Sequence, residues 1–188
     1  MNALFIYDWD DTLFPTSWII RNDYSIRTLN HKLKMYFTYL DKLVFNLLNN
    51  TMKLGDVIIV TNASIKWIEE CLECMPSVRK LIKSFIPVLS ARDKYSKLYP
   101  TEIEYWKKNT FNEITFKRLH KQVISIGDNE SEYLALVNVM KQNYCDVIKS
   151  IKFRGFPDNV LLINQQILLG KSLMKIVNFE GNLDLVIK

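Results

Sequence analysis

Short, uninterrupted apolar runs are spaced along the chain and set its fold class. Such runs are typical of strands covered on both faces, as in a parallel sheet, because strands with one wet face alternate polar and apolar residues. The sequence predicts strands at Ala3–Tyr7, Val57–Val60, Phe85–Leu89, Val123–Ile126 and Val147–Phe153.

Between these runs, apolar residues recur every three or four positions, which is the spacing of a helix with one buried face. The predicted helices cover about residues 25–50, 64–74, 77–84, 102–119, 130–143 and 158–170. Strands that alternate with helices predict an α/β fold, here a Rossmann-like parallel sheet sandwiched by helices. We expect a single domain over residues 1–188, in which the segment after about residue 155 either packs on the sheet or makes a dimer contact.

Charge and composition limit which kinds of binding partner and which cellular compartment are expected for this protein. The net charge of +5 permits an anionic partner without requiring one, and the basic residues are scattered. No run reaches about 18 apolar residues, so no membrane span is expected. The first residues have no basic region, and three cysteines are few, so we expect a cytoplasmic or nuclear protein that is not secreted.

Three of the predicted strands end in polar residues of similar kinds. The first runs into Asp8 and Asp10, the second into Thr61 and Asn62, and the fourth into Gly127-Asp128 with Glu132 four residues later. Ligands of open α/β sheets bind at the carboxyl ends of the strands, so these side chains are expected to converge on one edge.

Such a set of groups can support phosphoryl transfer. Clustered carboxylates repel one another unless a cation neutralises them, and hard oxygen ligands suit Mg²⁺. One carboxylate can attack a phosphoryl group while a second protonates the leaving oxygen. A hydroxyl, backbone N–H groups and a lysine can hold the phosphoryl oxygens as negative charge develops.

These residues resemble the motifs of the haloacid-dehalogenase (HAD-like) superfamily of phosphotransferases. The resemblance rests on Asp8-Trp9-Asp10-Asp11-Thr12-Leu13, on Thr61, and on Gly127-Asp128 with Glu132. It covers about residues 1–155, and the string from Asp8 to Thr16 is similar to that of HAD-like proteins of a minimal-cap kind.

The resemblance implies the catalytic and metal-binding roles. Asp8 is the implied nucleophile and a Mg²⁺ ligand, and Asp10 the general acid and base, with a backbone carbonyl that also binds the metal. Asp128 is an implied direct ligand, and Glu132 supports the ion directly or through water. Dehalogenases of the superfamily lack the second acid, so Asp10 favours phosphoryl chemistry.

The remaining roles concern the phosphate and the substrate. Thr61 is implied to bind the phosphoryl group with help from the Asn62 amide, and Thr12 to stabilise the loop that places Asp10. Trp18, close to the motifs, is a candidate substrate contact. The superfamily's lysine is assigned to Lys107, 21 residues before Asp128, with three alternatives: Lys94, Lys97 and Lys108.

The spacing of the motifs bears on the substrate. Between Asp8, Thr61 and Lys107 there is no room for a full cap domain, although a flap at about residues 13–24 can give partial cover. An open site suits a phosphomonoester on a macromolecule, a phosphoprotein more than a nucleic acid, cleaved through an aspartyl-phosphate. The alternatives are a catalytically weak HAD-like binding protein and a capless nucleic-acid-end phosphatase.

Overall fold

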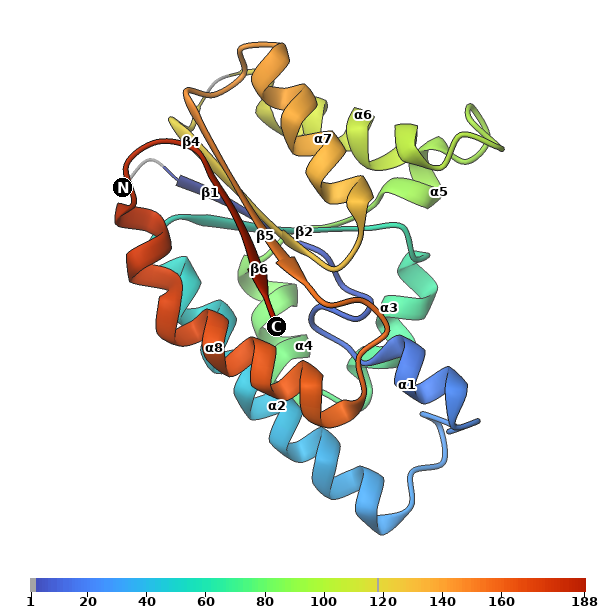
Figure 1. The fold of residues 1–188 in the computed structure, drawn as a ribbon. Coiled ribbons are helices and arrows are strands. Elements are labelled where there is room, and N and C mark those ends of the chain that lie inside the picture. The colour runs from blue at the N-terminus through green and yellow to red at the C-terminus, as the bar shows by residue number, and fades with distance from the viewer. Residues whose placement is uncertain (1–2, 118) are drawn as a thin grey trace.

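The computed structural model describes residues 3–117 and 119–188, which form one six-stranded parallel sheet. The strands lie in the order β3-β2-β1-β4-β5-β6 (Figure 1). Their bounds are β1 (Ala3–Tyr7), β2 (Asp56–Thr61), β3 (Val88–Ser90), β4 (Gln122–Gly127), β5 (Val147–Phe153) and β6 (Leu183–Ile187). The predicted α/β, Rossmann-like parallel sheet is therefore confirmed.

Helices cover both faces of this sheet. Helices α2, α4 and α8 lie against one face, and α5, α6 and α7 against the other (Figure 1). The helices are α1 (Thr16–Arg21), α2 (His31–Met52), α3 (Ile65–Leu72), α4 (Pro76–Phe85), α5 (Ala91–Tyr95), α6 (Glu104–Thr115), α7 (Glu130–Lys141) and α8 (Asn159–Asn178).

The apolar runs are uninterrupted because each central strand contributes side chains to two hydrophobic cores, one on each face of the sheet. In β1, Phe5 and Tyr7 join the cluster beneath α2 and α8, whereas Leu4 and Ile6 join the cluster beneath α6 and α7. All five β1 residues are buried. A polar side chain on either face of β1 would therefore lose its contact with water.

Several predicted boundaries are wrong by a few residues. Strand β3 begins at Val88, because Phe85 ends α4 and is exposed to solvent. Helix α2 begins at His31 instead of residue 25, since the Asn30 side chain accepts the N–H of Leu33 and caps the helix. Helix α6 ends at Thr115 and not at 119, and residue 118 of the predicted helix lies outside the described residues.

The segment after residue 155 belongs to the same sheet. Helix α8 continues through Gly170 to Asn178, so its predicted end at residue 170 is wrong, and the chain then forms the parallel edge strand β6. The buried Lys149 of β5 donates to three carbonyls at the end of α8, those of Ile176, Val177 and Phe179, at 2.7–2.9 Å. This ammonium satisfies carbonyl groups that a helix end leaves without partners.

By length and composition, α8 is the one described helix that is apolar enough to cross a membrane. In the structure it packs against α2 and β6, and 39% of its most apolar stretch is buried. The core helix of a globular domain passes the same test, so this finding is weak evidence for a membrane span.

Candidate active site

The strand order places the candidate site at a crevice in the sheet edge. From β1, the sheet extends to β2 on one side and to β4 on the other, and ligands of such sheets bind where the order reverses. Asp8 directly follows β1 and Asp128 directly follows β4. Both side chains line a cavity of about 480 Å³ at this edge.

The loop after β1 is a tight turn that carries three acids. The carbonyl of Trp9 accepts the N–H groups of Leu13 and Phe14 at 2.9 and 3.0 Å. Asp11 adopts a left-handed φ of 55°, which Asp tolerates better than most residues, and its carboxylate accepts the N–H of Ser17 at 2.8 Å. Asp11 thus ties the loop to the start of α1.

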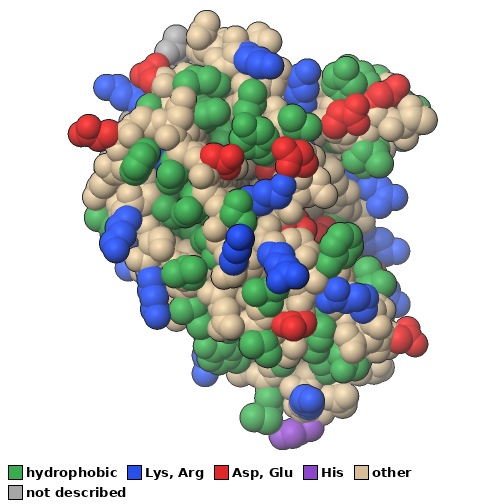
Figure 2. All heavy atoms as spheres, in the orientation of Figure 1, with side chains coloured by type: hydrophobic (Ala, Val, Ile, Leu, Met, Phe, Trp, Pro, Cys, Tyr) green, Lys and Arg blue, Asp and Glu red, His purple; other side chains and the backbone are tan. Residues whose placement is uncertain are grey.

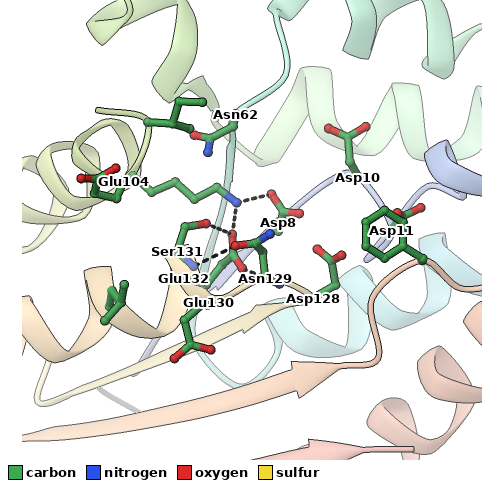
Figure 3. A pocket seen from close by; sticks show the side chains of 14 residues that line it. Asp8, Asp10, Asp11, Asn62, Glu104, Asp128, Asn129, Glu130, Ser131 and Glu132 are labelled. Carbon is green, nitrogen blue, oxygen red and sulfur yellow. Dashed lines mark hydrogen bonds and ion pairs between the residues drawn. The ribbon is translucent and has the colours of Figure 1, made fainter. Parts of the chain in front are cut away.

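Lys107 links two buried carboxylates at the base of the cavity. Its Nζ lies 2.5 Å from Oδ1 of Asp8 and also forms an ion pair with Glu132 (Figure 3). Glu132 additionally accepts the N–H of Asn129 at 2.9 Å, which completes a capping box at the start of α7. Residue 127 must be glycine, because a Cβ there would lie 2.5 Å from the Glu132 side chain.

The other candidate lysines lie elsewhere. Lys94 forms an ion pair with Glu113 on the surface, and Lys97 is exposed. Lys108 lies over the ring of Tyr105, with Nζ 5.1 Å from the ring centroid. The structure therefore places Lys107, and none of these three, against Asp8.

Burial and crowding shift the acid–base equilibria of the site. Burial raises the pKa of Asp8, Lys107 lowers it, and the carboxylates of Glu132, Asp128 and Asp10 raise it further, so the net shift is upward. Burial, followed by Glu132, raises the pKa of Asp128 to about 7. For Lys107, burial lowers the pKa, but the two carboxylates raise it by more, so the ammonium stays charged.

Asp10 lies on the cavity wall with its carboxylate pointing away from Asp8 (Figure 3). Oδ1 accepts the indole N–H of Trp67 at 2.9 Å and the hydroxyl of Thr16. Oδ2 lies 3.5 Å from the Thr61 hydroxyl. Three elements, α1, β2 and α3, thereby determine the orientation of this acid.

Of the residues predicted to bind the phosphate or the substrate, some line the cavity and others do not. Asn62 lines the cavity, and its buried Oδ1 has no hydrogen-bond partner among the described residues. Thr61 is fully buried, accepts the N–H of Ala63, and is not among the described lining residues of the cavity. Thr12 is buried and Trp18 packs against Tyr24, and neither belongs to the described lining of the cavity.

Three residues near the site were not found from the sequence. Trp67 contacts Asp10, and Gln166 of α8 donates to the carbonyls of Thr12 and Leu13 at 2.9 and 3.3 Å. Phe156, in the loop after β5, lines the mouth of the cavity. No sequence motif marks them, because each reaches the site from a segment far along the chain.

The donor set of the site fits a divalent cation. Within residues 3–117 and 119–188, no three His, Cys, Asp or Glu side chains are gathered to hold one metal ion, and Lys107 lies between Asp8 and Glu132. Mg²⁺, however, commonly binds one or two carboxylates together with water and phosphate. Asp8 and Asp128 supply two carboxylates that interact unfavourably without a cation.

We expect Mg²⁺ to remove a loss of stability that the protein without Mg²⁺ shows as pH rises. Without a divalent ion, Asp8 and Asp128 have raised pKa values in the folded state, so stability is full in acid and falls as pH rises toward about 7. Chelated protein should lose on the order of 2 kcal/mol of unfolding free energy between about pH 5 and about pH 8. Added Mg²⁺ should remove this loss, which urea titrations measure at each pH. If the unfolding free energy depended on pH in the same way with and without Mg²⁺, these two acids would bind no cation.

A scan against models of protein families found no match for this chain, and searches of curated proteins and of solved structures found none either.

Proposed function

We propose that the protein is a Mg²⁺-dependent phosphohydrolase that cleaves phosphomonoesters on a macromolecule through an aspartyl-phosphate on Asp8. The observation that carries the proposal is the buried contact between Asp8 and Lys107 at the switch point of the sheet. The motif resemblance to HAD-like phosphotransferases supports it, as does the second acid, Asp10, on the wall of the same cavity.

In the proposed reaction, a carboxylate oxygen of Asp8 attacks phosphorus, and the bond from phosphorus to the ester oxygen breaks. Asp10 gives its proton to the departing oxygen. Asp10 then takes a proton from water as that water attacks the aspartyl-phosphate, which releases inorganic phosphate and the Asp8 carboxylate. Lys107 and Asn62 line the cavity, and in this proposal they hold phosphoryl oxygens while the charge on those oxygens increases.

The ion would be held by the carboxylates of Asp8 and Asp128 and by the backbone carbonyl of Asp10. When bound, Mg²⁺ supplies positive charge to the phosphoryl oxygens. Glu132 contributes by holding Lys107 and the start of α7 in place.

Trp67 is proposed to position the acid–base group. Replacing it with Phe removes the indole N–H that bonds to Asp10 but keeps an aromatic ring against Phe14. A hydrogen bond to a charged group is worth about 1.5–3 kcal/mol, so kcat should fall about 10- to 100-fold with little change in KM. The effect should vanish in an Asp10→Asn background, and an equal loss in that background would assign Trp67 a purely structural role.

The activity itself is tested with a generic aryl phosphate and the purified full chain. We expect hydrolysis that requires Mg²⁺ and stops on chelation. Binding of Mg²⁺ without turnover of any compound in a broad phosphoester panel would contradict the proposal and favour a HAD-like binding protein.

A further inference from the structure

The mouth of the active-site cavity carries exposed apolar side chains. Ile103 and Leu134 are each 51% exposed, and Phe156 is 76% exposed. They come from three separate places, the start of α6, the helix α7 and the loop after β5, and all three line the cavity that holds Asp8. Exposed apolar side chains around the opening of a cavity that holds a buried nucleophile can contact the part of a substrate that stays outside.

Phe156 is held in this position by a specific contact. Its φ is +53°, a left-handed conformation that is unfavourable for a bulky side chain. The guanidinium of Arg21 donates to the carbonyls of Phe156 and Pro157 at 3.0 and 2.7 Å. The ring is exposed, so burial in the core does not account for this backbone conformation.

The same cavity is strongly acidic, although the whole chain carries a net charge of +5. Its only cationic lining residue among those described is Lys107, against seven acids: Asp8, Asp10, Asp11, Glu104, Asp128, Glu130 and Glu132. Further cations lie close by: Lys152 pairs with Glu130, Arg21 binds the Phe156 loop, and the exposed Arg154 precedes Gly155, which lies against Asp128. Together with Lys107 they still leave a surplus of acids.

This charge acts on the part of the substrate beyond the phosphate. A divalent cation and a phosphate dianion cancel each other, so the surplus carboxylates determine the field at the mouth. Glu104 and Glu130 are exposed there, and Glu130 is paired with Lys152. A polynucleotide would be repelled, whereas cationic groups would be attracted. Figure 2 shows acidic, hydrophobic and basic side chains together on the face that it draws, with several Lys and Arg side chains near its centre.

We infer that the substrate is a phosphorylated peptide segment in which the residues next to the phosphorylated side chain are apolar and basic. Phe156, with Ile103 and Leu134, contacts the apolar neighbour, and Glu104 and Glu130 attract the basic one. This inference rests on the proposed function and names the substrate class of that same site.

The test is a panel of phosphopeptides that share one phosphorylated residue and differ only in its neighbours. The assay uses the full chain with Mg²⁺ at low salt. A peptide with Leu and Lys beside the phosphorylated residue should have a kcat/KM about tenfold above that of a peptide with Leu and Glu there. High salt should shrink this ratio. A double variant, Glu104→Gln with Glu130→Gln, should largely abolish the preference for Lys over Glu.

The apolar part of the inference has its own variant and control. Phe156→Ala should reduce the preference for Leu over Gly neighbours, which we expect to be about tenfold in the parent protein. Phe116→Ala removes another exposed phenylalanine, next to α6 and outside the cavity lining, and should leave the preference unchanged. Equal losses in the two variants would overturn the role of Phe156.

Binding measurements separate failure of this inference from failure of the proposed function. Fluorescence anisotropy of labelled phosphopeptides should rank them in the same order whether or not they are hydrolysed. Equal binding of all peptides, or faster cleavage of an end-phosphorylated single-stranded oligonucleotide, would overturn the inference while leaving a phosphohydrolase intact. Absence of turnover with every phosphoester, with the ranking of binding retained, would overturn only the proposed reaction.

Discussion

Replacing Asp8 with asparagine is expected to lower the turnover of an aryl phosphate by roughly four orders of magnitude or more. The amide has nearly the shape of the carboxylate but no anionic oxygen to attack phosphorus. Because burial and neighbouring acids raise the pKa of Asp8, a neutral side chain there should not destabilise the protein at neutral pH. Loss of activity in a chain of undiminished stability is the expected result.

Asp56→Asn is a matched control for this variant. Asp56 lies at the opposite end of the sheet, at the start of β2, where it is exposed and pairs with His120. This control should keep the parent rate. If Asp8→Asn retained more than about a hundredth of the parent rate, nucleophilic attack by Asp8 would be excluded.

Replacing Lys107 with methionine is expected to affect both stability and activity. The variant leaves Asp8 and Glu132 buried without their shared cation, and breaking a buried ion pair in this way destabilises proteins by about 3–5 kcal/mol. Urea titration measures this loss, which should be smaller in acid because protonation of Asp8 relieves the repulsion. Losing the positive charge should also lower kcat by about 10²- to 10³-fold.

Lys108→Met tests whether these effects are specific. Lys108 is the next residue of α6 and contacts only the ring of Tyr105 among the interactions described for it. Its replacement should change the unfolding free energy by less than about 1 kcal/mol. If Lys107→Met proves too unstable to assay, Lys107→Arg keeps the charge and should retain stability better than the methionine variant. Equal stability of the 107 and 108 methionine variants would refute the assigned role of Lys107.

The parts of the fold that the sequence predicts are those set by local pattern. The five apolar runs predict β1 to β5 because buried parallel strands need apolar side chains on both faces. The sequence pattern does not predict the sixth strand. It predicts a helix that ends at Gly170, whereas the structure continues α8 to Asn178 and then forms β6. Packing of α8 against α2 and the sheet outweighs the weak helix propensity of one glycine.

The same distinction holds for the candidate site. The positions of Asp8 and Asp128 follow from strand ends, because parallel strands bring their carboxyl ends to one edge. Lys107, inside α6, is expected only from the resemblance to HAD-like proteins and its distance from Asp128. The contacts of Trp67 and Gln166 depend on how α3 and α8 are rotated against the loop, and no local pattern encodes that rotation. Phe156 escapes prediction because its left-handed backbone is fixed by Arg21, more than a hundred residues earlier in the chain.

Trapping the covalent intermediate shows whether Asp8 itself carries the phosphoryl group. The full chain is mixed with an aryl phosphate and Mg²⁺, quenched in acid during turnover, digested and examined by mass spectrometry. We predict one phosphoryl group on Asp8, absent when Mg²⁺ is chelated and absent from Asp8→Asn. Steady turnover with Asp8 unmodified, or a phosphoryl group on a different residue, would contradict the account.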